Sequence, residues 1–154
     1  MTRRRVGIAL ALVVVSASAG PGAAPASSSR RDPAVTAYLA RANTVCRRFA
    51  KQLATIPPPA DPRSFSDIEA SVGKALPVLE AQASAVRAIV PPTSLAARVR
   101  ALNALVAHSN GYLRQALVAE RKRQRTRMGL AYGAWLEASS DAHDAAVELG
   151  FRCS

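Results

Sequence analysis

The two cysteines are the residues with the clearest potential chemistry. Cys46 and Cys153 stand 107 positions apart, and the sequence contains neither C-x-x-C nor C-x-x-C-H, the motifs of redox pairs and covalent haem. Two cysteines in an exported protein are expected to be oxidised. Closing a loop of this length stabilises a fold by about 4 to 5 kcal/mol in the chain-entropy model. We therefore predict a structural Cys46–Cys153 disulfide, with two free thiols as the alternative.

Histidine is the next residue type that supports metal, haem or general-base chemistry. The periodicity places His108 far from the apolar stripe of its predicted helix, and His143 near the edge of its own stripe. Inward Glu-x-x-His pairs, G-x-S-x-G, S-x-x-K and glycine-rich phosphate loops do not occur in the sequence. The polar residues from Ser139 to His143 fit a solvated helix edge better than a catalytic triad. We predict no catalytic residue, metal or cofactor, and hence a protein that is not an enzyme.

A basic run is the local feature that exceeds the background composition. Five cations fall within seven positions, at Arg121, Lys122, Arg123, Arg125 and Arg127. Each such residue contributes about 1 kcal/mol near an anionic surface, so anionic cell-wall polymers or lipid headgroups are the predicted partners. The alternative is a solvated turn whose cations favour a helix C-terminus. Nucleic acid is not expected, because no aromatic residues interleave with these cations.

The first nineteen residues have the order of a secretory signal peptide. Arg3 to Arg5 precede an apolar run, which ends in the A-x-A site at Ala19. The run from Val6 to Ala19 has fourteen residues, whereas a bilayer requires about 20, so a retained membrane anchor is the less favoured alternative. We predict cleavage after Ala19, or less readily after Ala26, and a secreted or extracytoplasmic protein without a transmembrane helix. Removal of the three arginines lowers the formal net charge from +11 to +8.

Residues 20–31 are rich in Gly, Ala, Pro and Ser and have no apolar periodicity, so they are predicted to be a disordered leader. The first helix is predicted from Pro33, with Asp32 as its N-cap, to Ile56, where three prolines follow. Its apolar stripe includes Cys46.

The second predicted helix begins near Ser66, which has Glu69 three positions later in a capping-box pattern, and it ends at Val90. Its apolar stripe keeps its phase across Pro77, so a kink is favoured over a division into two helices. Pro91 and Pro92 follow the stripe.

The third helix is predicted to begin after Thr93 or Ser94 and to end in the basic run. The fourth is predicted from about Thr126 to Leu149, with Gly150 as a left-handed cap. Its predicted inner face comprises Met128, Tyr132, Trp135, Ser139 and Ala146.

Four helices of similar length with short connectors predict a single antiparallel up-down-up-down bundle over residues 32–154. The predicted disulfide adds a geometric condition, because Cys46 is about 20 Å along the first helix. Either the fourth helix ends level with that point, or the C-terminal tail turns back along the first helix.

Several short motifs resemble a group of uncharacterised exported helical-bundle proteins of high-GC actinobacteria. The group is characterised by A-N-x-I-C near the start and L-G-x-x-C at the end. The matching residues are Tyr38, Ala42-Asn43, Val45-Cys46, Pro57 to Pro59, Pro77, Leu149-Gly150 and Cys153. The resemblance implies a four-helix bundle with paired cysteines and no known activity. The basic run replaces a more neutral connector.

Two functions follow as hypotheses. The first is an exported, non-enzymatic protein that binds in the cell envelope through Arg121, Lys122, Arg123, Arg125 and Arg127. The second is a carrier of a small apolar ligand between the helices, with Tyr132, Trp135 and the Pro77 kink lining the pocket. The sequence does not determine an oligomeric state.

Overall fold

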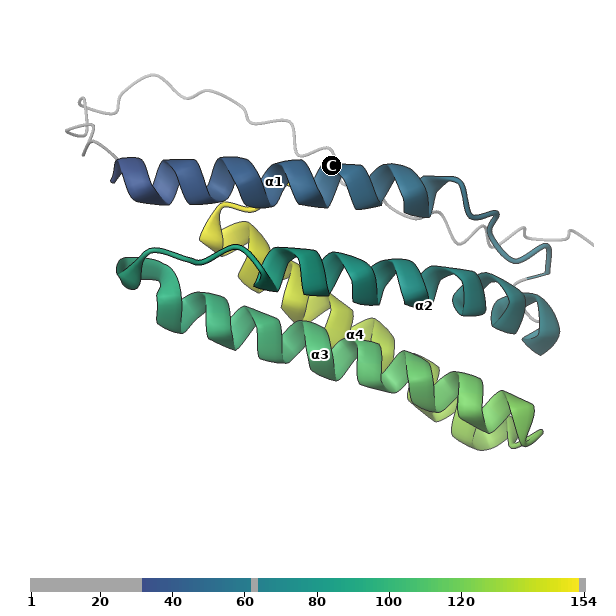
Figure 1. The fold of residues 1–154 in the computed structure, drawn as a ribbon. Helices are drawn as coiled ribbons and strands as arrows, with labels where there is room; N and C mark the ends of the chain where they lie inside the picture. Colours follow the sequence, from purple (N-terminus) through teal and green to yellow (C-terminus); the bar gives the residue numbers. More distant parts are fainter. Residues whose placement is uncertain (1–31, 62–63, 153–154) are drawn as a thin grey trace, which may run out of the picture.

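The computed structural model describes residues 32–61 and 64–152, which form four α-helices (Figure 1). They are α1 (Pro33–Ala54), α2 (Phe65–Arg87), α3 (Thr93–Arg121) and α4 (Arg125–Leu149). Successive helices run in opposite directions, and each packs mainly on its neighbour in the chain (Figure 1). The predicted all-α, up-down bundle is confirmed. The predicted signal peptide (1–19), its cleavage sites at Ala19 and Ala26, and the predicted leader (20–31) lie outside the described residues.

Helix α1 begins as its sequence predicts. The Asp32 Oδ1 atom accepts a hydrogen bond from the Ala34 backbone N–H at 2.9 Å, so the side chain satisfies a donor that the helix leaves open. The helix ends at Ala54, two residues before the predicted Ile56. There the Thr55 hydroxyl donates to the Gln52 carbonyl oxygen at 2.7 Å, and the following prolines prevent further helix.

Helix α2 begins one residue earlier than predicted and has a different cap. The Ser64 hydroxyl oxygen, not Ser66, accepts a hydrogen bond from the backbone N–H of Asp67, at 3.3 Å. The helix stops at Arg87, so Val90 lies beyond it and is 81% exposed rather than part of a buried stripe. Helix α2 is continuous through Pro77, which is exposed; the kink at this residue stays a prediction.

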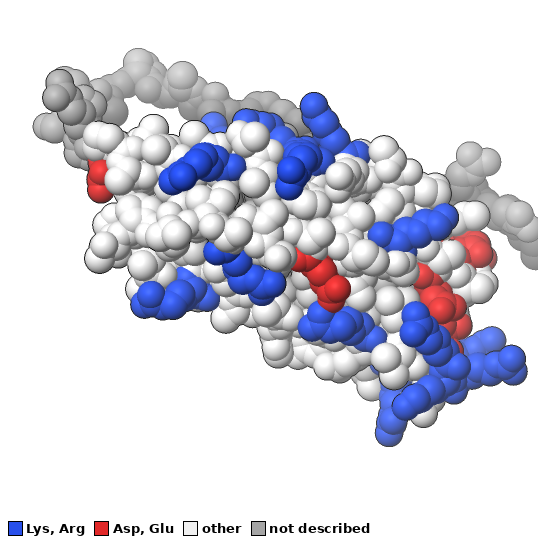
Figure 2. Space-filling view, in the orientation of Figure 1, with Lys and Arg blue, Asp and Glu red and all other residues white. Residues whose placement is uncertain are grey.

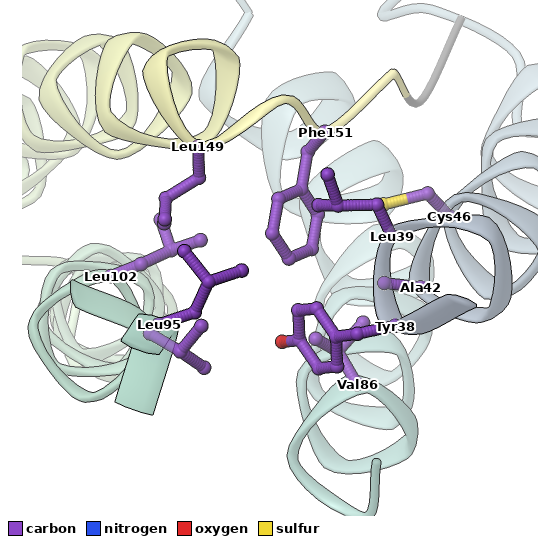
Figure 3. Packing of buried hydrophobic residues seen from close by; sticks show 10 residues of the cluster. Tyr38, Leu39, Ala42, Cys46, Val86, Leu95, Leu102, Leu149 and Phe151 are labelled. Atoms are coloured by element: carbon purple, nitrogen blue, oxygen red, sulfur yellow. The ribbon is translucent and has the colours of Figure 1, made fainter. Parts of the chain in front are cut away.

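The larger hydrophobic core lies where α1 crosses the other helices. Figure 3 shows Tyr38 and Cys46 of α1, Leu102 of α3 and Leu149 of α4 around the ring of Phe151. The rings of Tyr38 and Phe151 meet edge to face, with centroids 6.2 Å apart, an arrangement that aromatic pairs favour. This cluster joins all four helices.

A smaller core lies between α3 and α4, near the turn that connects them. Its buried members are Ala116, Ala119, Met128 and Ala131, and Phe65 and Ile68 of α2 pack against it. The predicted inner face of α4 was therefore partly wrong. Besides Met128, the buried residues of α4 are Ala131, Ala138, Ala142 and Leu149. Tyr132, Trp135, Ser139 and Ala146 are half-buried, because alanines let α3 and α4 approach closely and turn the larger side chains to the edge.

The chain after α4 turns back onto α1. Gly150 has φ +94°, the left-handed conformation predicted for it, and a β-carbon there would lie 3.2 Å from Leu39 Cδ1. Phe151 is buried in the larger core, and the Arg152 backbone N–H donates to Asn43 Oδ1 at 2.7 Å. The tail therefore follows α1 toward its centre, the second of the two geometries that a Cys46–Cys153 bond would allow.

Tyr38 should limit stability at high pH. Its side chain is fully buried, and its hydroxyl has no hydrogen-bond partner within the described part of the chain. Burial raises the pKa of Tyr38 above its ordinary value of 10.0. Above about pH 10 the unfolded state ionises at Tyr38 while the folded state stays protonated, so the free energy of unfolding falls as pH rises.

Tyr38→Phe should raise the free energy of unfolding by about 1 kcal/mol at pH 7, because it removes a buried hydroxyl without a partner. It should also make the decline of stability above about pH 10 shallower. Urea unfolding at both pH values measures these effects. Tyr112→Phe is the control, because Tyr112 already bonds to His108 and is half-buried. A loss of stability at pH 7 in Tyr38→Phe would contradict this account.

Candidate functional site

The basic run forms one end of the bundle. Its five predicted anion-binding residues lie at the end of α3, in the connecting turn and at the start of α4. All five are exposed: Arg121, Lys122, Arg123, Arg125 and Arg127. Figure 2 shows Lys and Arg side chains gathered at the end of the molecule where α3 meets α4. We call these five residues the basic end.

The turn within the basic end has a defined geometry. Two hydrogen bonds close α3: Gln124 N–H donates to the Ala119 carbonyl at 2.8 Å, and Arg123 N–H donates to the Glu120 carbonyl at 2.7 Å. This pair is the Schellman motif, which requires a left-handed residue that is usually glycine. Arg123 occupies that position with φ +54° and is the only described non-glycine residue with positive φ. A cation therefore stands where glycine would be less strained.

The cations of the basic end are not neutralised by neighbouring carboxylates. In residues 32–61 and 64–152 the ion pair formed is Arg114 with Glu80, on α3 and α2 outside this run. The Arg125 guanidinium lies 5.6 Å from the centre of the Phe65 ring, and Arg127 Nη1 donates to Gln124 Oε1 at 3.3 Å. Positive charge at this end is therefore available to an external anion.

An open groove of about 760 Å³ runs beside the basic end between α3 and α4. Lys122 and Arg127 line it together with two exposed apolar residues, Val118 (48% exposed) and Leu130 (70% exposed). Cationic and apolar side chains thus share one surface. Such a combination suits the boundary between lipid headgroups and acyl chains.

The predicted ligand pocket is partly present. Trp135 lines a partly open cavity of about 300 Å³ to which all four helices contribute residues, whereas Tyr132 does not line it. The two rings lie 5.2 Å apart between centroids. Pro77 is exposed on α2 and is not one of the residues that line this cavity.

The wall of this cavity is mainly apolar and has a smaller polar part. Val86, Leu102, Val106 and Phe151 form apolar parts. The polar parts are Gln82, Asn103, Ser109, Asn110, Ser139 and His143.

Ser109 and Asn110 were missed by the sequence analysis. They are 5% and 6% exposed, and they are the buried polar residues of the described chain. Both lie on α3 between Val106 and Leu113, in the spacing of the buried stripe. That interruption of an apolar stripe was the available signal for a polar interior site.

The two histidines lie apart from each other, and neither belongs to a metal-ligating cluster in the described part of the chain. His108 Nε2 lies 3.0 Å from the Tyr112 hydroxyl on the surface, and His143 is exposed at the cavity edge. The Ser139 hydroxyl donates to the Leu136 carbonyl at 2.9 Å rather than to His143. Within the described ranges, no three His, Cys, Asp or Glu residues come close enough together to hold a metal ion.

Cys46 is 3% exposed in the larger core, and Gln82 Nε2 lies 3.6 Å from its sulfur. The described part of the chain contains no free cysteine. Cys153 lies outside the described residues, so the Cys46–Cys153 bond stays a prediction.

Comparisons with protein-family models, curated proteins and solved structures give no match to this chain. None of the helices in the described residues has the length and apolarity needed to cross a membrane. The function of the protein is therefore inferred from its own residues.

Arg123 affects stability in two ways, through the strain of its left-handed backbone and through its charge, and substitutions can distinguish them. Arg123→Gly should raise the free energy of unfolding by about 1 kcal/mol, because glycine adopts positive φ without strain. Arg121→Gly removes the same charge from the last turn of α3 and should lower stability, by up to about 1 kcal/mol. Denaturant unfolding of both variants measures the opposite signs. Equal destabilisation by the two substitutions would contradict the proposed strain.

Proposed function

We propose that this protein is exported, has no enzymatic activity, and binds an anionic surface of the cell envelope through its basic end. The observation that carries the proposal is the group of five exposed cations without carboxylate partners, at one end of a rigid helical pair. Each contributes about 1 kcal/mol near an anionic membrane, so together they are sufficient for salt-dependent association. Arg123 adds one of these exposed cations at the turn between α3 and α4.

Lipid headgroups are favoured over a wall polymer as the anionic partner. Val118 and Leu130 lie in the same groove as Lys122 and Arg127 and are exposed. A polymer without apolar groups gains nothing from these side chains, whereas the upper part of a lipid layer does. Leu130 would then contact the same lipid surface that the cations bind.

Export is supported by the position of the C-terminal tail. Gly150 lies against Leu39, and Arg152 bonds to Asn43, so two residues of tail pass about one turn of α1. Asn43, which Arg152 contacts, precedes Cys46 by three helical residues, or about 4.5 Å along α1, and one extended residue spans about 3.3 Å. We propose a Cys46–Cys153 disulfide, which is typical of an oxidising compartment outside the cytoplasm.

Binding to the basic end is tested with a pair of variants of equal net charge. One replaces the basic end: Arg121→Gln, Lys122→Gln, Arg123→Gly, Arg125→Gln and Arg127→Gln. The control replaces five exposed cations elsewhere: Arg41→Gln, Arg47→Gln, Lys51→Gln, Arg87→Gln and Arg100→Gln. Sedimentation with phosphatidylglycerol-containing vesicles at low salt should fall more than about tenfold for the first variant and less than about threefold for the control.

High salt should release the native protein from these vesicles, because counterions screen exposed charges. Leu130→Ser should weaken vesicle binding without changing retention on a purely anionic polymer. Equal losses in the two five-fold variants would show that overall charge, and not the basic end, determines association. Salt-insensitive binding would exclude the electrostatic proposal.

The disulfide is tested on protein exported to an oxidising compartment. Mass spectrometry without reduction should give one peptide pair that contains Cys46 and Cys153, and reduction should lower the free energy of unfolding by about 2 to 5 kcal/mol. Cys153→Ser is the matched variant, because it removes the bond and leaves Cys46 in the core. Alkylation of both thiols in the exported native protein would overturn this prediction.

A further inference from the structure

The interior cavity is a second candidate site, separate from the basic end. It lies against the larger core, and α1, α2, α3 and α4 all contribute to its wall. We propose that it binds a neutral small molecule with an apolar body and one hydrogen-bonding group, and that Asn110 holds that group.

Asn110 supplies the first part of the argument. This residue is 94% buried and lines the cavity, and its amide is not one of the solvent-inaccessible polar atoms without a partner in the described part of the chain, so the amide faces the open space of the cavity. The neighbouring Ser109 is 95% buried and also lines the cavity. Buried amides and hydroxyls in proteins almost always have a partner, which is protein, ordered water or ligand. Here the partner is water or a ligand in the cavity, and a ligand that bonds to Asn110 would replace that water.

The wall determines the charge of the ligand. It contains no Lys, Arg, Asp or Glu, although the molecule as a whole is strongly basic. An ion in such an interior would lack a counter-charge and would lose its hydration. The site therefore selects a neutral molecule.

The apolar part of the wall and the volume of the cavity determine the apolar body of the ligand. Val86, Leu102, Val106 and Phe151 face the cavity with aliphatic and aromatic carbon. A volume of about 300 Å³ is twice that of the roughly 150 Å³ cavity that accepts benzene, which corresponds to roughly ten non-hydrogen atoms. A benzene ring with a short chain that ends in a hydroxyl fits both the volume and a wall that is mainly apolar with a smaller polar part.

Residues at the edge of the cavity show how a ligand can enter and how its binding can be detected. Exposed His143 and half-buried Trp135 lie on the wall, so the cavity is not sealed from solvent. Trp135 is the single tryptophan of the chain. Its fluorescence, excited where the probe molecules do not absorb, therefore reports occupancy directly.

The experiment titrates the full protein with 3-phenylpropan-1-ol and with propylbenzene, which lacks the hydroxyl. We expect a saturable change of Trp135 fluorescence with a dissociation constant of about 0.1 to 1 mM for the alcohol. Propylbenzene should bind about 5- to 10-fold more weakly, because it leaves Asn110 without a partner. A purely apolar cavity would give the opposite order.

Two kinds of variant assign the site. Asn110→Leu should abolish or reverse the preference for the alcohol while the protein stays folded, since it removes the buried amide. Ala142→Leu, or Ala83→Leu from the facing helix, should weaken both probe molecules at least tenfold by filling the cavity. Ala104→Leu is the control, because Ala104 is exposed on α3 and lies outside the wall. Circular dichroism checks the fold of each variant.

Absence of saturable binding by either molecule up to its solubility would overturn the proposal and assign the cavity to water. An unchanged alcohol preference in Asn110→Leu would overturn the role of Asn110. The variant without the basic end should bind both molecules as the native protein does, so this site and the proposed envelope binding can fail independently.

Discussion

The contact of the C-terminal tail with α1 holds the bundle together as one unit. Helix α1 packs mainly on α2, and Phe151 adds the aromatic contact with Tyr38 that brings the end of the chain into the same core. The hydrogen bond from Arg152 to Asn43 fixes the direction of the tail along α1. The wall of the interior cavity depends on this arrangement, because Phe151 and Cys46 both contribute to it. A tail that left α1 would open the cavity and the larger core together.

The element order and most helix ends could be predicted, because local signals determine them. Asp32 followed by Pro33, and Gly150 after Leu149, are strong signals of a helix start and a helix end. The inner face of α4 could not be predicted from hydrophobicity, since alanine contributes little to an apolar stripe and Tyr132 and Trp135 dominate it. Close packing of Ala131 against Ala116 and Ala119 of α3 overrides that pattern, a tertiary effect that single-helix periodicity does not contain.

The two candidate sites differ in how far the sequence reveals them. The basic end is contiguous in the chain, so its residues could be identified from composition alone, although the left-handed conformation of Arg123 could not, because arginine is not typical of that position. The cavity is assembled from residues on four helices. Asn110 could be identified as a site residue only from the structure, in which it lines one cavity together with Trp135 and Phe151. The break in the α3 stripe at Ser109 and Asn110 was readable, but its interpretation required the neighbours.

The extensive pairing of α3 with α4 has a consequence for how the chain reaches this structure. These helices are adjacent in sequence and joined by a three-residue turn. Their contacts therefore close short loops, and the chain loses little conformational entropy when they form. The contacts between α1 and the tail join residues more than 100 positions apart. The α3–α4 hairpin is therefore the natural nucleus for folding. Helix α1 then completes its packing only after Phe151 and Arg152 have been synthesised.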